Sequence, residues 1–88
     1  LGGSQSLTLM LRLRIVSPEK VMFHGEVESV LVPGMVGPFE ILNDHAPIIS
    51  TLTKGRVEYT EKDGKKQFDI EGGFVEVKRN EVNLCVEV

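Results

Sequence analysis

The amino-acid sequence predicts a small all-β protein, a flattened antiparallel β-sandwich of two sheets with nine to ten short strands. Three observations support this prediction. Apolar and polar residues alternate through most of the chain, which is the pattern of strands with one buried face. Helical periodicity is nearly absent, and turn residues recur at the spacing that is typical of sandwiches and barrels. The 88 residues suffice for one core and leave little room for a second.

The first half of the chain contains five strand-like segments. The dipeptide His24-Gly25 is expected to separate the second from the third, and His45-Ala46-Pro47 is expected to form a turn before the fifth. Val27 and Val30 break the alternation, which indicates a bulge or a strand that is buried on both faces. The expected strands cover residues 9–15, 20–23, 26–32, 39–42 and 48–53.

The second half reads as two hairpins. Asp63-Gly64 is a strong hairpin signal, because glycine accepts the positive φ that a tight turn needs. Arg79-Asn80 is expected to turn the chain into its last strand. The expected strands cover residues 56–60, 67–71, 75–78 and 81–88.

Composition excludes several classes of function. The net charge is −3 and the isoelectric point is near 5.3, so the chain lacks the basic face of a nucleic-acid-binding protein. Cys85 is the only cysteine and cannot form an internal disulfide, which fits a reducing compartment. No apolar run is long enough to span a bilayer, so direct membrane insertion is not expected. Residues 1–8 are expected to be a cloning remnant or a disordered tail, and residues 9–88 the folded domain.

The sequence does not predict an enzyme. Ser17 or Ser50 could be combined with His45 and Asp44 as a triad, but an orienting carboxylate must reach the imidazole from its far side, which an adjacent Asp does poorly. A metal site needs three or four clustered ligands, and the two histidines, His24 and His45, stand twenty-one positions apart. No phosphate-binding glycine loop is present. We therefore expect no catalytic residue, metal, cofactor or small-molecule substrate.

Three sequence segments resemble those of a known family. They are VSPEKVMFHGEVESV at 16–30, VPGMVGPFEILNDHAPIIS at 32–50 and GGFVEV at 72–77. In this order and at these spacings they closely resemble the amino-terminal β-sandwich domain of the epsilon subunit of bacterial F-type ATP synthase. The resemblance runs from about residue 13 to the end of the chain.

The resemblance implies a non-catalytic central-stalk (rotor) subunit of a proton- or sodium-translocating ATP synthase. Such a subunit links the gamma subunit to the c-ring during ATP synthesis and is peripheral to the cytoplasmic face of the bacterial inner membrane. The resemblance also implies that Ser17, His45 and Ser50 face gamma. A different reading of His45 is that the surrounding turn fixes it locally. Epsilon subunits usually continue into two regulatory helices, and that regulatory function is not assigned to these residues.

The resemblance also implies that one loop contacts the c-ring, but the sequence of that loop differs from the family pattern. Relatives often carry acidic residues there, whereas Met35, Val36, Gly37 and Pro38 form an apolar tip in this chain. This tip is expected to be either an exposed patch facing the c-ring or a loop folded back on the core. Glu40 could supply a carboxylate two positions later.

A rival hypothesis from another class is a free-standing β-sandwich module that binds a peptide or a carbohydrate. Such a module would need a concave face lined by aromatic side chains. The chain has one Tyr, four Phe and no Trp, which disfavours it.

Overall fold

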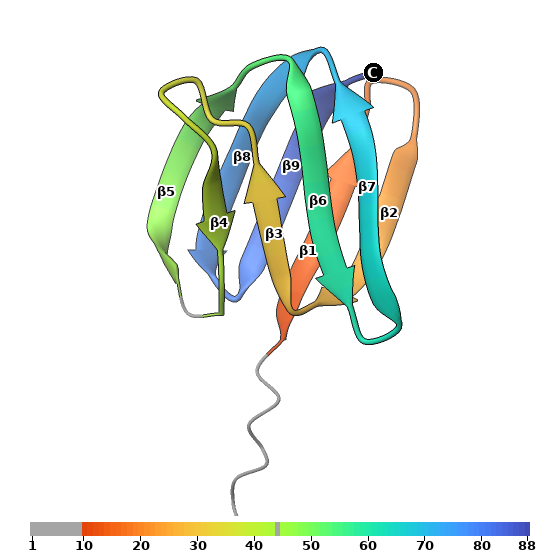
Figure 1. Cartoon of the computed structure of the whole chain (residues 1–88), viewed down its shortest axis with the longest axis vertical. Coiled ribbons are helices and arrows are strands. Elements are labelled where there is room, and N and C mark those ends of the chain that lie inside the picture. Colours follow the sequence, from red (N-terminus) through yellow and green to blue (C-terminus); the bar gives the residue numbers. More distant parts are fainter. Residues whose placement is uncertain (1–9, 44) are drawn as a thin grey trace, which may run out of the picture.

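The computed structural model describes residues 10–43 and 45–88, which form two facing β-sheets (Figure 1). These residues contain nine strands and no helix, so no described helix could cross a membrane. The predicted all-β sandwich is confirmed. The expected tail, and Leu9 at the start of the first expected strand, lie outside the described residues. The strands are β1 (Leu11–Val16), β2 (Val21–Val27), β3 (Ser29–Val32), β4 (Phe39–Ile41), β5 (His45–Leu52), β6 (Gly55–Glu61), β7 (Gly64–Ile70), β8 (Gly72–Arg79) and β9 (Glu81–Glu87).

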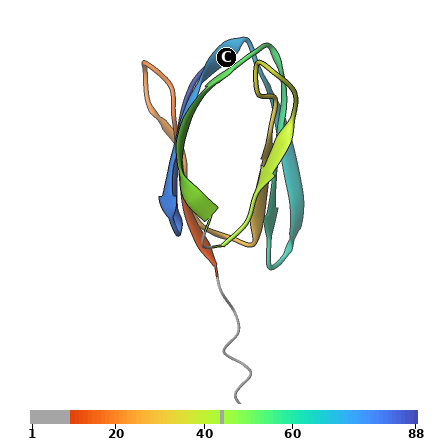
Figure 2. The same ribbon diagram turned by 90° about the vertical axis from the view of Figure 1, so that its left-hand side faces the viewer.

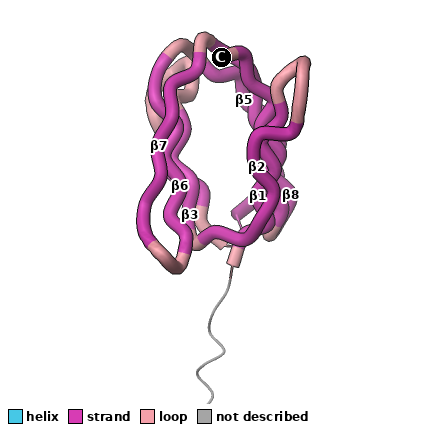
Figure 3. Tube along the Cα trace, turned by 90° about the vertical axis from the view of Figure 1, so that its right-hand side faces the viewer, coloured by secondary structure: helices cyan, strands magenta, loops and turns pink. Residues whose placement is uncertain are grey.

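The two sheets are seen edge-on as two layers in Figures 2 and 3. One sheet has five strands in the order β2-β1-β9-β8-β5, and the other has four in the order β4-β3-β6-β7. All neighbouring strands are antiparallel except β1 and β9, which pair in parallel. The antiparallel prediction therefore holds with this one exception, which brings the first and last described strands together in the centre of the larger sheet.

The parity break between Val27 and Val30 has a simple structural cause. β2 belongs to the five-stranded sheet and β3 to the four-stranded sheet, so the chain crosses between the layers at Glu28. The Glu28 N–H donates to the Thr60 carbonyl oxygen at 2.6 Å, which fixes the crossing. Val27 and Val30 are both fully buried, each from its own sheet. The predicted bulge or doubly buried strand is thus a change of sheet.

Two of the expected breaks between strands are wrong, because the chain continues as a strand at both places. β2 runs without a break through His24-Gly25, because Gly25 pairs with Leu13 and keeps the ladder intact. The tripeptide His45-Ala46-Pro47 is the start of β5 instead of a turn. Proline is tolerated there because β5 is an edge strand and its register shifts between His45 and Ile48. The predicted hairpin at Asp63-Gly64 is confirmed, and Gly64 has a φ of 143°.

The core fills the space between the sheets and follows the predicted alternation. In β1, Leu11, Leu13 and Ile15 are buried while Arg12 and Arg14 are exposed. No polar side chain is buried among the described residues, so close apolar packing holds the layers together. The fully buried or nearly buried residues are Leu11, Leu13, Ile15, Val27, Val30, Val32, Ile41, Leu52, Val57, Ile70, Val75, Val77, Val82, Leu84 and Val86.

Candidate interaction surfaces

The loop between β3 and β4, residues 33–38, is anchored at its base to β5. The Met35 N–H donates to the Thr51 carbonyl at 3.0 Å, and the Thr53 N–H donates to the Pro33 carbonyl at 2.9 Å. Gly34 forms an isolated bridge with Leu52. The loop that starts in the four-stranded sheet is therefore held by the edge of the five-stranded sheet.

Gly34 gives this loop its tight shape. The Gly37 N–H donates to the Gly34 carbonyl at 3.0 Å and closes a short turn. A Cβ at Gly34 would lie 2.7 Å from the Gly37 carbonyl oxygen and 2.9 Å from the Phe39 ring. Both contacts are too short for a real Cβ, so only glycine fits at this position without a shift of the loop.

The tip of the loop is an exposed apolar patch. The exposed fraction is 66% for Met35 and 104% for Val36, and Pro38 is also exposed. Of the two expected conformations, the structure shows the exposed patch and not a loop folded on the core. Glu40 is exposed on β4, where it pairs with Leu31 of β3.

Ser17 follows β1 and shapes the connection to β2. Its Oγ accepts weak hydrogen bonds from the N–H groups of Lys20 at 3.3 Å and Glu19 at 3.4 Å. The Lys20 carbonyl in turn lies 3.3 Å from the same hydroxyl. Ser17 therefore has a local turn-forming role as well as partial exposure at the end of the sheet.

The three residues expected to face gamma lie along one sheet and are not gathered into one cluster. His45 and Ser50 are five positions apart on β5, which corresponds to about 16 Å along a strand. Ser17 follows Val16, and the paired residues Val16, Cys85, Phe74 and Thr51 form a row across four strands. Ser50 pairs with the buried Val75, so its side chain lies on the inner face at the edge of the sandwich.

The outer face of the five-stranded sheet exposes apolar side chains that the sequence reading missed. Phe74 is 45% exposed and lies opposite Cys85 and Thr51 in the register, and Ile49 is 72% exposed. A shallow groove of about 550 Å³ lies on this face. The outward direction of Phe74 could have been predicted from the alternation along the strand, since Phe74 precedes the buried Val75. The apolar part of the groove is lined by Val16, Pro18, Phe74, Cys85 and Val86.

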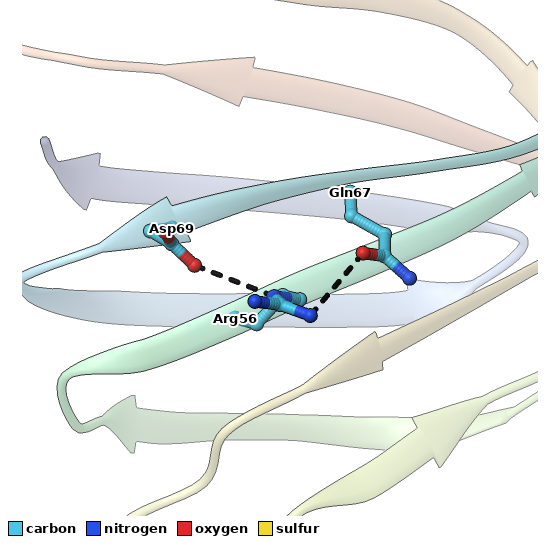
Figure 4. A network of polar contacts seen from close by, with 3 residues as sticks. All are labelled: Arg56, Gln67 and Asp69. Atoms are coloured by element: carbon cyan, nitrogen blue, oxygen red, sulfur yellow. Dashed lines mark hydrogen bonds and ion pairs between the residues drawn. The ribbon is translucent and has the colours of Figure 1, made fainter.

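The four-stranded sheet has the opposite character, because its outer face is charged and internally paired. Arg56 donates from Nε to Asp69 and from Nη1 to Gln67, each at 3.4 Å (Figure 4). At the hairpin end of the same sheet, in the inner-face register of Tyr59, Lys66 donates to Glu61 at 3.0 Å, and this hydrogen bond raises the pKa of the Lys66 ammonium group. All four ion pairs of the described residues lie on this sheet or at its end. They are Lys54–Glu71, Arg56–Asp69, Lys65–Glu58 and Lys66–Glu61.

Three of the aromatic residues, Phe23, Tyr59 and Phe68, pack together against the core. The rings of Phe23 and Tyr59 have centroids 4.7 Å apart, and those of Tyr59 and Phe68 are 6.3 Å apart. These rings come from both sheets and pack against the core, where partial burial raises the pKa of the Tyr59 phenol and the charge of Glu61 raises it further. Three of the five aromatic side chains therefore pack against the core, which leaves few for the rival module that binds a peptide or a carbohydrate.

Candidate catalytic and metal-binding groups are also dispersed. Asp44 lies outside the described residues, and of His45 only the backbone is described. In the described part of the chain, no three His, Cys, Asp or Glu side chains gather where they could hold a metal ion.

The sequence profile of the ATP synthase delta/epsilon chain β-sandwich domain matches residues 10–88. The chain belongs to this family. A protein of Leptospira interrogans named ATP synthase epsilon chain is 42% identical over 77 residues, which are 88% of this chain and 61% of that protein. The epsilon chain of Chlorobium limicola is 44% identical over 86% of this chain and 88% of its own length. The chain thus spans about three fifths of the Leptospira protein and most of the Chlorobium protein.

Two solved structures share the fold of this family member. A chain in the Euglena gracilis mitochondrial ATP synthase, solved with its OSCP, F1 and c-ring parts, matches with a TM-score of 0.84 and 20% identity. The match covers 98% of this chain and 56% of that chain. A chain in the central stalk and c-ring of the Tetrahymena thermophila mitochondrial enzyme matches with a TM-score of 0.76, at 16% identity, over 89% of this chain and 63% of that one. These likenesses establish the sandwich fold.

Proposed function

We propose that this chain is a non-catalytic central-stalk (rotor) subunit of a proton-translocating F-type ATP synthase, which links the gamma subunit to the c-ring during ATP synthesis. The observation that carries the proposal is the match of the delta/epsilon β-sandwich family to residues 10–88, which include all nine strands. The proposal places the chain as a peripheral subunit at the cytoplasmic face of the bacterial inner membrane, attached through its partners.

The outer face of the five-stranded sheet and its β5 edge together form the gamma-facing surface in this proposal. Ser17 follows β1 at the end of this sheet, and His45 and Ser50 lie on the edge strand β5, with the Ser50 side chain on the inner face at that edge. Phe74 and Ile49 expose apolar area on the outer face, whereas the outer face of the other sheet carries the ion pairs Arg56–Asp69 and Lys65–Glu58. A face whose charges are already paired gains little from a partner, and an exposed apolar face gains from burial.

The c-ring contact is assigned to Met35, Val36, Gly37, Pro38 and Glu40. The tip is exposed, and its base is fixed by backbone hydrogen bonds to β5, so the patch is presented on a rigid support. Its apolar side chains favour a contact through burial, and the exposed carboxylate of Glu40 on β4 is available for an ionic contact.

The mechanical role follows from the way in which the two surfaces are joined. The Met35 N–H donates to the Thr51 carbonyl, and Thr51 is the neighbour of Ser50 on β5. The ring-facing loop is thus bonded directly to an edge strand of the gamma-facing sheet. A close-packed apolar core resists shear, so a turning ring would move gamma without deforming the sandwich between them.

A binding experiment with both partners tests this function. The purified chain is mixed with the gamma subunit and, separately, with the purified c-ring of the same organism, and retention is measured against an unrelated β-sandwich of similar charge. We expect one-to-one binding to gamma and retention on the c-ring. Failure to bind either partner above the unrelated control would refute the proposal.

A further inference from the structure

The edges of the two sheets differ in how they are protected. An edge strand exposes unpaired backbone N–H and C=O groups, and charged side chains usually keep other chains from pairing with them. The edge strand β7 carries Lys65, Lys66 and Asp69, and the edge strand β2 carries His24 and Glu26. The edge strand β4 is only three residues long. In contrast, β5 has no charged residue from position 46 to position 52.

The hydrogen-bonding pattern shows which backbone groups of β5 face its open side. The Thr51 carbonyl accepts from Met35, so the polar groups of Thr51 point away from β8. Ile49 stands two positions earlier, and its N–H and C=O point the same way because these groups alternate along a strand. The Ile49 N–H, the Ile49 C=O and the Thr51 N–H therefore take no part in the ladder to β8. Within the described residues they also have no backbone hydrogen bond to any other segment.

Apolar side chains surround the Ile49 part of this open edge, and the polar Ser50 and Thr51 follow it. Ile49 is 72% exposed on the outer face, Ile48 is 37% exposed, and Leu42 at the end of β4 is 52% exposed. Pro47 has no N–H and lies within the register shift, so it ends the open edge on that side. The loop at Met35 ends it on the other side.

We propose that an extended segment of the gamma subunit pairs with the open edge of β5 and adds a sixth strand to the five-stranded sheet. The inference rests on the proposed function, because it assigns the edge to gamma through Ser50 and His45, the gamma-facing residues on the same strand. The Ile49 N–H and C=O and the Thr51 N–H provide the backbone hydrogen bonds, and the neighbouring isoleucines favour apolar side chains in the segment.

Amide hydrogen exchange tests this pairing directly. Exchange is measured by NMR on the isotope-labelled chain, alone and with an excess of gamma. We expect the Ile49 and Thr51 amides to exchange at least about tenfold more slowly in the complex, because each gains an acceptor. The Ile48 and Ser50 amides point toward β8 and serve as internal references that are protected in both states.

A pair of variants separates backbone pairing from side-chain contact. Ile49→Pro removes the N–H on the open side and leaves the ladder to β8 intact, whereas Ile49→Ala keeps the N–H and removes most of the side chain. We expect Ile49→Pro to weaken gamma binding about fivefold to tenfold more than Ile49→Ala does, which is the effect of about one hydrogen bond. If Ile49→Pro does not fold, the exchange measurement on the unmodified chain decides.

Three results would overturn the inference. If gamma binds but the Ile49 and Thr51 amides exchange at the rates of the free chain, the pairing is wrong and the proposed function stands. If the same amides become protected without gamma as the chain concentration rises, a second copy occupies the edge. If gamma does not bind at all, the proposed function fails as well.

Discussion

Replacing the apolar tip by Met35→Ser and Val36→Ser should loosen attachment to the c-ring. Complete burial of a Met or Val side chain contributes about 1.5–3 kcal/mol. Met35 is 66% exposed and Val36 is fully exposed, so about two thirds of the first contribution and all of the second are available to a partner. If the contact lies at a partly solvated rim of the interface, about half of this burial free energy contributes to binding. The loss in the double variant is then about 1–3 kcal/mol, or roughly a 5-fold to 150-fold loss of affinity.

The double variant should fold normally, because the loop is held through the backbone of Met35 and not through its side chain. Retention on the purified c-ring and on gamma is measured separately, at 0.1 M and at 1 M salt. The Debye length falls from about 10 Å to about 3 Å over this range, which weakens exposed ion pairs and leaves apolar burial intact. We therefore expect ring binding of the unmodified chain to survive high salt, and gamma binding of the variant to change little.

Glu40→Gln is the matched control, since it removes the nearby charge and leaves the tip unchanged. The apolar-tip reasoning predicts a small effect of this control on the c-ring. Ring binding that disappears in salt, is lost in Glu40→Gln and ignores the double Ser change would refute it, and would show that charge makes the contact.

The other predictions concern nucleotide binding, the gamma surface, the fold and its pH dependence. Isothermal titration of the chain with ATP should show no micromolar site, and such a site would contradict the prediction. His45→Glu should weaken gamma binding by about 1–3 kcal/mol in a chain that still folds; an unfolded variant would instead make this histidine structural. Gly73→Ala should cost about 2–5 kcal/mol in chemical denaturation, because φ is 144° and the added Cβ would lie 2.1 Å from the Cys85 carbonyl oxygen, while Gly72→Ala should cost less than about 1 kcal/mol. Stability should fall as the pH rises above 10.0, since the raised pKa of Tyr59 favours the neutral phenol in the folded state, and Tyr59→Phe should remove that part of the loss.

The sequence predicted the fold well wherever one face of a strand is buried. Alternation in β1 and the hairpin at Asp63-Gly64 are local signals, and both are confirmed. The errors occurred where tertiary structure overrides a local signal. His24-Gly25 continues a strand because Gly25 pairs with Leu13 in β1, and Pro47 lies within a strand because that strand is an edge. The parity break at Val27 was seen, but local reasoning could not distinguish a bulge from a change of sheet.

The candidate surfaces were predictable only in part. The loop at Met35 was identified from its glycines and from the family resemblance, and its exposure needed the structure. The positions of Ser17 and Ser50 relative to each other depend on the strand order, which alternation alone does not determine. The exposure of Ile49 and Phe74 was not predicted, because alternation does not show which apolar side chains of a sheet face solvent until the strand register is known.

Restoration of coupling tests the central claim most directly. Membrane vesicles of the source organism are depleted of the native epsilon subunit, the purified chain is added back, and ATP-driven proton pumping is compared with ATP hydrolysis. We expect the chain to bind in a one-to-one ratio with gamma and to restore pumping, because it links the shaft to the ring. Vesicles that remain uncoupled with the chain bound, or that never bind it, would contradict a rotor function.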